Sequence, residues 1–162
     1  MSIAEIDEMT QYLTFKLQDE VFALDISKVR EVLDFTTVTK VPRMPDFLRG
    51  VINLRGSVVP VIDLRLKFGM PITAKTVNTC VIIVEVKLND ETVILGVLAD
   101  SVQEVMDLEA DAIEPAPRIG THLKTDFIKG MGKHKETFIM ILDIDKVFTA
   151  DDIEIVKDAG SE

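Results

Sequence analysis

The sequence predicts a mainly β fold in which two small closed barrels pack against each other. Three features support this prediction: an internal repeat covers most of the chain, runs of alternating apolar residues mark short strands, and Gly and Pro punctuate the tight bends between them. Four or five short strands in each half favour closed barrels over one open sheet, because closure removes the exposed strand edges.

The repeat is a duplication of strands and turns. FLRGVINLRGSVVPVIDLRLKF at 47–68 aligns without a gap on FIKGMGKHKETFIMILDIDKVF at 127–148, at a constant offset of 80 residues. The identical positions are Phe47, Gly50, Asp63 and Phe68, which recur as Phe127, Gly130, Asp143 and Phe148. A second match, LDISKVREVL at 24–33 with LADSVQEVM at 98–106, lies upstream of each copy. Each half is therefore expected to run hairpin, short helix, connection, strand, turn, strand.

Each half begins with a predicted hairpin. In the first, QYLTFKL at 11–17 alternates apart from Tyr12, and a turn at 18–20 leads to the return run VFALDI at 21–26. In the second, TCVIIVEVKL at 79–88 and TVILGVLA at 92–99 flank a turn of the same kind.

Gly96 lies inside the second run of the second hairpin. A glycine there indicates a bulge or a close approach of the backbone.

Three helices are predicted from capping patterns. Ser101-x-x-Glu104 has the form of a capping box, so a short helix is expected from Ser101, with a counterpart beginning near Ser27 in the first half. Thr149-x-x-Asp152 predicts a last helix at about 150–158.

Arg55-Gly56-Ser57 is expected to form a tight turn between two strands, with Pro60 confined to an edge or a bulge. Asp63 and Asp143 occupy equivalent places after a strand, where a helix N-cap explains both.

The predicted organisation is a single domain spanning 1–162. Its subdomains are expected at about 11–68 and 78–148, followed by the C-terminal helix. Residues 69–78 would cross between the two barrels, and a groove would lie where the barrels meet.

Composition limits the classes of function. The net charge of −10 argues against nucleic-acid binding, and no signal peptide or membrane span is evident, so we expect a cytoplasmic protein. Residues 28–75 nevertheless hold nine Lys and Arg against four acids, a net charge of +5 that leaves −15 on the rest of the chain. That segment could meet an acidic protein partner, or it could be a solvated basic face.

No motif for catalysis or cofactor binding is visible. His122 and His134 lack the spacing of a metal site, and the lone Cys80 lies in an apolar run without a partner for a disulfide. Asp63 and Asp143 could in principle act as acid and base, although the capping role is favoured. We therefore expect no enzymatic activity, no metal and no cofactor.

Several segments together resemble a known family. GVINLRGSVVPVIDLRLKFG at 50–69, LADSVQEVMDL at 98–108, EPAP at 114–117 and the ending FIKGMG…MILDIDKVF are similar to the CheW family of bacterial chemotaxis coupling proteins. The resemblance implies two SH3-like five-stranded barrels and a non-catalytic adaptor. Such an adaptor joins the cytoplasmic hairpin tip of a chemoreceptor to the regulatory domain of the chemotaxis histidine kinase, and it alternates with that domain in rings that build membrane receptor arrays.

The resemblance also implies two sets of contact residues. The receptor-binding residues would be Val29, Glu31, Gly50, Arg55, Cys80 and Val105. Val29 and Glu31 would lie on the first short helix and Val105 on the helix from Ser101, while Arg55 would pair with acidic or carbonyl groups of the receptor. The kinase-binding residues would be Phe35, Val38, Ile113, Glu114, Arg118 and Ile119.

Other readings of the sequence stay open beside the adaptor. The same fold also forms the regulatory domain of the kinase and the front half of CheV couplers, although 162 residues leave no room for a kinase core or a receiver domain. A double β-barrel could alternatively bind a small ligand, and an enzyme could use carboxylates in an unrecognised arrangement.

Overall fold

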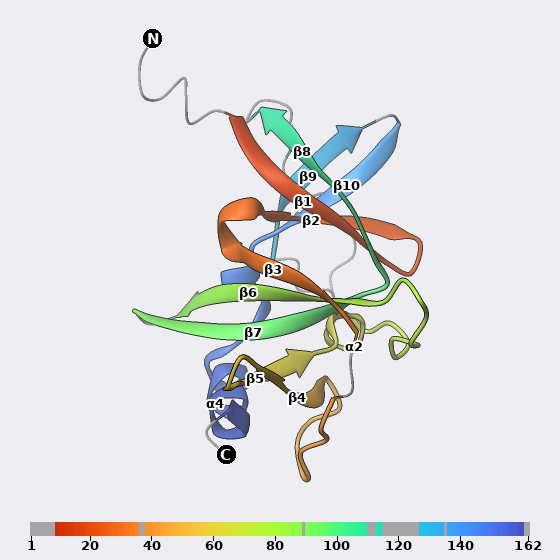
Figure 1. Ribbon diagram of the computed structural model, residues 1–162. Helices are drawn as coiled ribbons and strands as arrows, with labels where there is room; N and C mark the ends of the chain where they lie inside the picture. The colour runs from red at the N-terminus through yellow and green to blue at the C-terminus, as the bar shows by residue number, and fades with distance from the viewer. Residues whose placement is uncertain are drawn as a thin grey trace.

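The computed structural model describes residues 9–35, 38–88, 90–109, 113–114, 127–134 and 136–160. Within these residues it contains two five-stranded curled sheets, shown one above the other in Figure 1, which confirms the predicted fold class. The upper sheet has the order β8-β1-β2-β10-β9 and the lower sheet the order β3-β6-β7-β5-β4.

The bounds of the elements follow the chain. The strands are β1 (Met9–Leu17), β2 (Glu20–Asp25), β3 (Val29–Asp34), β4 (Leu48–Leu54), β5 (Ser57–Ile62), β6 (Cys80–Leu88), β7 (Glu91–Ala99), β8 (Ser101–Glu109), β9 (Ile128–His134) and β10 (Thr137–Leu142). The helical elements are the 3₁₀ turn η1 (Ile26–Lys28) and the helices α2 (Leu64–Lys67), α3 (Ile144–Val147) and α4 (Ala150–Gly160).

The two sheets do not follow the two halves of the chain. The first hairpin, β1–β2, joins β8, β9 and β10 in the upper sheet, and the second hairpin, β6–β7, joins β3, β4 and β5 in the lower sheet. Each hairpin pairs in parallel with the last strand of the other half, β2 with β10 and β7 with β5. The expected division at 11–68 and 78–148 therefore does not match the strand pairing, because the halves exchange their hairpins.

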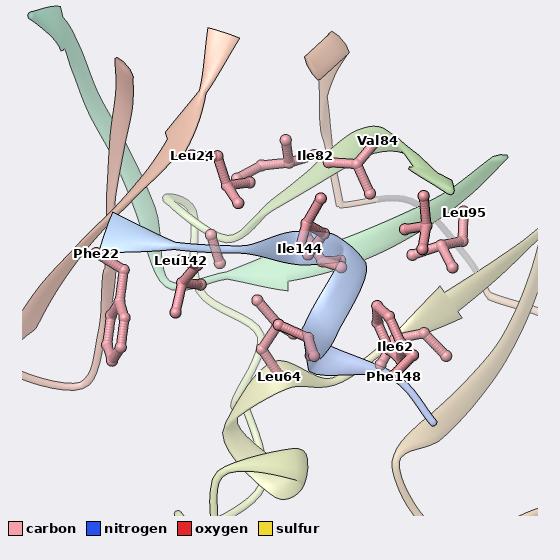
Figure 2. Packing of buried hydrophobic residues seen from close by; sticks show 14 of the residues in the cluster. Phe22, Leu24, Ile62, Leu64, Ile82, Val84, Leu95, Leu142, Ile144 and Phe148 are labelled. Carbon is pink, nitrogen blue, oxygen red and sulfur yellow. The ribbon is translucent and has the colours of Figure 1, made fainter. Parts of the chain in front are cut away.

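Alternation along the strands fills three apolar clusters. A central cluster lies between the sheets, and it includes Leu13 and Phe15 from β1 together with Ile82 and Val84 from β6. Figure 2 shows Ile144 of α3 and Leu64 of α2 among side chains from strands of both sheets. Two smaller clusters fill the upper and the lower barrel. Because the central cluster draws on both halves, neither half holds its own complete core.

The helix expected from Ser101 is absent, and residues 101–109 form strand β8 instead. β8 pairs antiparallel with β1, and this pairing buries Met106 and Leu108 on one face. Thr14 sits where the β1–β8 register shifts, and its hydroxyl bonds to both the N–H and the C=O of Glu104 (3.1 and 2.8 Å). The capping pattern misled because pairing with the free edge of β1 buries more apolar surface than a short helix would.

Two further expectations need correction. The helix expected near Ser27 is only η1, a single 3₁₀ turn capped by Asp25, and β3 follows directly. Pro60 is neither on an edge strand nor at a bulge, since β5 lies between β4 and β7. Its pairing with β7 begins at the next residue, Val61, so the missing N–H of Pro60 precedes the parallel ladder.

The predicted caps are confirmed. Asp63 caps α2 and Asp143 caps α3, each accepting the backbone N–H two residues on. At the last helix, Thr149 N–H donates to Asp152 and the Asp152 N–H donates to the Thr149 hydroxyl, which is a reciprocal capping box. The helix then extends to Gly160, two residues beyond the expected end.

The repeated glycines have the same structural cause. Gly50 of β4 and Gly130 of β9 each lie against a crossing segment of the chain. Thr39 forms a β-bridge with Val51, the residue after Gly50, and Glu114 forms one with Met131, the residue after Gly130. A Cβ on Gly50 would overlap the carbonyl oxygen of Thr39, and one on Gly130 would come within 2.8 Å of the Glu114 carbonyl oxygen. Glycine recurs there because the backbone of a crossing segment occupies the place of a side chain.

Two ion pairs of opposite polarity fasten the exchanged hairpins. Arg65 of α2 binds Asp100 at 3.0 Å, and Asp100 also accepts the N–H of Gln18 in the turn of the first hairpin. At the equivalent place in the second half, Asp145 of α3 binds Lys28 at 2.8 Å and accepts the N–H of Lys87 in the second hairpin. Arg65 and Asp145 are equivalent positions of the repeat, and their partners Asp100 and Lys28 are one position apart in the upstream match, so the repeat keeps the place of the contact to within one residue and inverts its charge.

We predict that Asp63→Asn lowers stability far more than Asp143→Asn. The fully buried Asp63 carboxylate accepts four hydrogen bonds, from Arg65 N–H, Arg49 Nη1, Thr73 N–H and the Thr73 hydroxyl, at 2.7 to 3.1 Å. An amide offers a single acceptor oxygen, so we expect a loss of about 2–4 kcal/mol in urea denaturation. Asn caps a helix as well as Asp, so Asp143→Asn should cost less than about 1 kcal/mol. Equal losses would contradict this assignment.

A second prediction concerns acid stability. Burial raises the pKa of Asp152, but the hydrogen bond and charge of Lys67 and the bonds from Thr149 outweigh it, so the pKa lies below its ordinary value of 3.8. The ionised carboxylate thus contributes stability that is complete above pH 3.8 and is lost as pH falls through the folded-state pKa. The free energies of unfolding of the parent and Asp152→Asn, measured by urea denaturation, should differ by about 1–2 kcal/mol at pH 7 and converge in acid. A gap that stays constant as pH falls below 3.8 would refute this.

Candidate functional site

Arg55 stands at the tip of the β4–β5 hairpin, as the sequence predicts. Arg55 and Gly56 form a two-residue turn with φ angles of 51° and 88°, and the Gly56 N–H donates to the Asn53 side chain at 2.9 Å. Left-handed backbone at an arginine costs about 1 kcal/mol. The Arg55 side chain is 73% exposed, so the turn presents a guanidinium to solvent on a rigid support.

An ion pair orients this guanidinium. Arg55 Nη2 donates to both carboxylate oxygens of Glu31 on β3, at 2.7 and 3.0 Å. β3 and β4 are the two outermost strands of the lower sheet, so the contact links the edges that curl toward each other. An exposed pair of this kind adds less than about 1 kcal/mol to stability. Its main consequence is therefore the direction in which Arg55 points.

A surface depression of about 320 Å³ lies beside this ion pair. It is lined by Arg30, Glu31, Leu54, Arg55, Ile83 and Ile94. Leu54 and Ile94 pack against the apolar cluster of the lower barrel, while the three charged residues form the rim. An apolar floor with a charged rim suits an apolar side chain of a protein partner, flanked by groups that pair with Arg and Glu.

The other receptor-binding candidates of the lower sheet lie on three of its strands. Val29 and Glu31 are on β3, a strand and not the expected helix, and Gly50 is buried in β4. Cys80 opens β6 as predicted and pairs with Asp34 of β3. Burial raises the pKa of the Cys80 thiol, an effect that Asp34 reinforces and a hydrogen bond with the Val102 backbone opposes.

Val105 belongs to the other sheet. It lies on β8 opposite Leu13, with 49% of its surface exposed, and it does not line the Arg55 depression. Cys80 of β6 pairs with Ala99 at the end of β7, and β8 starts two residues later at Ser101, so Val105 is four residues along β8 from that junction. The structure therefore groups five of the six candidates on the lower sheet and leaves Val105 apart.

The kinase-binding candidates fall on two separate faces. Phe35 and Val38 pack against the apolar cluster of the lower barrel, and Lys75 Nζ lies 5.5 Å from the centre of the Phe35 ring. Ile113 packs against the cluster of the upper barrel, and the exposed Glu114 bridges to Met131 of β9. Arg118 and Ile119 lie outside the described residues.

Sequence reasoning missed most of the floor of the depression. Leu54, Ile83 and Ile94 come from three different strands, and nothing in their spacing indicates that they meet. One signal pointed to the area: Gly96 lies opposite Ile83 in the β6–β7 ladder, and a Cβ on it would come within 2.6 Å of Val81. The ladder has no bulge at Gly96, and the close approach there is made by side chains of β6, whereas the Pro60 carbonyl oxygen would be an ordinary 3.7 Å from that Cβ. The predicted bulge or backbone approach is therefore not what the structure shows.

Most cations of the segment 28–75 are engaged within the molecule. Lys28, Arg30, Arg49, Arg55, Arg65 and Lys67 each form an ion pair with an acid. Across the part of the chain that the structure describes, no group of three or more His, Cys, Asp or Glu could hold a metal ion. Nor do the described residues include a helix long and apolar enough to cross a membrane.

Comparison with known proteins agrees with this architecture. The family model of the CheW-like domain matches residues 11–152. The chemotaxis protein CheW of Klebsiella aerogenes is 36% identical over 146 residues, covering 90% of this chain and 86% of that protein. CheW of Rhizobium meliloti is 30% identical over 144 residues, covering 89% and 90%.

A solved structure has the same fold. The scaffolding protein TtCheW of Thermoanaerobacter tengcongensis superimposes with a TM-score of 0.76 at 34% identity, covering 88% of this chain and 89% of that one. With a family model that spans both sheets, relatives that align over nearly their whole length and a shared fold, the chain belongs to the CheW-like family of non-enzymatic chemotaxis scaffold proteins.

Proposed function

We propose that this chain couples the cytoplasmic tip of a chemoreceptor to the regulatory domain of the chemotaxis histidine kinase. The observation that carries the proposal is Arg55, held exposed on a rigid turn beside an apolar depression in a chain of the CheW-like family. Such a site binds a protein surface through a few anchor residues.

The receptor tip docks at the Arg55 depression. Arg is favoured as an anchor because its planar fork makes directional bonds to carboxylates and carbonyl groups. Leu54 and Ile94 supply the apolar contact, and the neighbouring candidates Val29, Gly50 and Cys80 shape the adjoining strands. Val105 extends the contact to the upper sheet.

The kinase regulatory domain docks at the two faces marked by Phe35 and Val38 on the lower barrel and by Ile113 and Glu114 on the upper one. Arg118 and Ile119 remain members of the proposed kinase contact set, with no position assigned to them. Separate faces allow one coupler to touch a receptor and two kinase domains together, as a ring requires. The chain then acts on the cytoplasmic side of the membrane, where receptor arrays recruit it.

We predict that Arg55→Asp weakens binding to a purified receptor hairpin fragment by at least about thirtyfold, the ratio that corresponds to a hot-spot loss of about 2 kcal/mol. Isothermal titration would measure the affinity. The free energy of unfolding in urea should stay within about 1 kcal/mol of the parent's, because the Arg55–Glu31 pair is exposed.

Two variants control for the change in charge. Lys133→Asp reverses an exposed cation on β9 of the upper sheet and should leave receptor binding unchanged. Arg55→Lys keeps the charge, loses the fork, and should weaken binding by an intermediate amount. Full receptor binding by Arg55→Asp would remove this residue from the site.

A separate prediction tests the kinase face. Glu114→Lys should weaken binding to the kinase regulatory domain about five- to tenfold while leaving receptor affinity unchanged, because the exposed Glu114 lies away from the Arg55 depression. Arg55→Asp should show the reverse pattern. Fluorescence anisotropy with each partner alone would reveal this double dissociation, and a variant that weakens both partners equally would contradict separate faces.

A further inference from the structure

A second surface groove lies on the lower barrel away from Arg55. It has a volume of about 340 Å³ and is formed by the segment 40–49, by α2 and by the crossing segment 69–79. Its apolar lining comes from Val41, Met44, Leu48, Leu66 and Ile72. It shares no lining residue with the Arg55 depression, and none of the receptor or kinase candidates lines it.

Both walls of this groove are rigid. Pro42 and Pro45 restrict one wall, and the Leu48 N–H donates to the Pro45 carbonyl at 3.0 Å. In the other wall, the carbonyl of Pro71 accepts from Arg65 Nε at 2.8 Å, and the buried Asp63 holds the Thr73 N–H and hydroxyl. A groove with fixed walls loses little conformational freedom when it is filled.

Part of the apolar lining of the groove is exposed to solvent. Ile72 is 55% exposed at the rim although the residues on both sides of it are anchored by hydrogen bonds to α2 or to Asp63. Arg43 has a φ of 61°, and it is the one non-glycine residue with positive φ in the described chain that lies outside a hairpin turn. Strained backbone of this kind persists where the surrounding structure needs it.

Charge indicates what could fill the groove. The molecule carries −10 overall, yet Lys40 lines this groove and Arg43 lies next to lining residues, both exposed, against the single exposed acid Asp46. Neither Lys40 nor Arg43 makes an ion pair within the described part of the chain. These two cations attract a carboxylate-rich segment although the molecule as a whole has a negative net charge.

A small carboxylate ligand fits less well than a polypeptide. The cation nearest the floor, Arg49, already donates through Nη1 to Asp63 and to the Thr73 carbonyl, both at 3.1 Å. The exposed cations stand outside the apolar floor, so a ligand must span both regions to use them. An amphipathic segment does so with apolar side chains inward and carboxylates toward Lys40 and Arg43.

We propose that this groove is a docking site for an acidic amphipathic segment of a partner protein, distinct from the receptor and kinase surfaces. Ile72 and Met44 contact the apolar side chains of that segment, and Lys40 and Arg43 pair with its carboxylates. The site shares no residue with the Arg55 depression, so an experiment can contradict this proposal without contradicting the coupling function.

The test titrates the ¹⁵N-labelled full chain with a synthetic 14-residue peptide that carries leucines on one helical face and glutamates on the other. A counterpart with lysines in place of the glutamates controls for charge, and phosphatidylglycerol vesicles test for a membrane surface. The expected result is saturable NMR shifts at Lys40, Met44, Leu66 and Ile72 with the acidic peptide alone, and weaker binding at higher salt.

Matched variants locate the site. Ile72→Ser should weaken binding of the acidic peptide about tenfold. Val77→Ser should not, since Val77 is 98% exposed on the same crossing segment and does not line the groove. Lys40→Glu should weaken binding, and Arg55→Asp should leave it unchanged.

Several outcomes would overturn the proposal. They are the absence of saturable shifts, equal binding of the lysine counterpart, shifts centred on Arg55, equal effects of Ile72→Ser and Val77→Ser, or preferential binding to the vesicles.

Discussion

The structure depends on the exchange of hairpins between the two halves of the chain. Each hairpin is the interior of the sheet that it joins, β1–β2 between β8 and β10 and β6–β7 between β3 and β5, so neither sheet forms without a contribution from the other half. The central apolar cluster follows from this arrangement, because Phe15 and Leu24 from one hairpin and Ile82 and Leu95 from the other meet within it. The Arg55 depression follows as well. Its floor takes Leu54 from the first half and Ile83 and Ile94 from the exchanged hairpin.

The two ion pairs at the hairpins explain how a duplicated chain can assemble in one way. After a duplication, both hairpins would fit both sets of remaining strands about equally well. Arg65 faces Asp100 on one side, whereas Asp145 faces Lys28 on the other, so the equivalent contacts have opposite polarity. Interchanging the hairpins would break both contacts. It would set the cation Lys28 against Arg65 and the carboxylate Asp100 against Asp145. Partly buried pairs of this kind contribute more to the choice of arrangement than to overall stability.

Local features could be predicted from the sequence because local chemistry causes them. The Arg55-Gly56 turn, the caps at Asp63 and Asp143 and the Thr149–Asp152 box need only neighbouring residues, and all are present. The failures concern pairing over long distances. The repeat established that the halves are equivalent but not which strands pair, since an exchanged and an unexchanged arrangement have the same repeat. β8 was predicted as a helix because its capping pattern is local and its pairing with β1 is not. Within the candidate site, Arg55 was visible as the tip of a turn, whereas the apolar floor required the three-dimensional arrangement.

The crossing segment 69–79 has a consequence for how the molecule could be taken apart. Cutting the chain there would give one fragment with β1 to β5 and another with β6 to β10, and each would hold a hairpin that belongs in the sheet of the other. Such fragments would not behave as autonomous modules, because each separate piece lacks the interior of its sheet. When the two fragments are mixed, each supplies the hairpin that the sheet of the other lacks. They would therefore be held together by strand pairing and by the central cluster instead of by a peptide bond. A protein of this design resembles a heterodimer whose two subunits are joined in one chain, and its repeat boundary is a natural position for a split reporter.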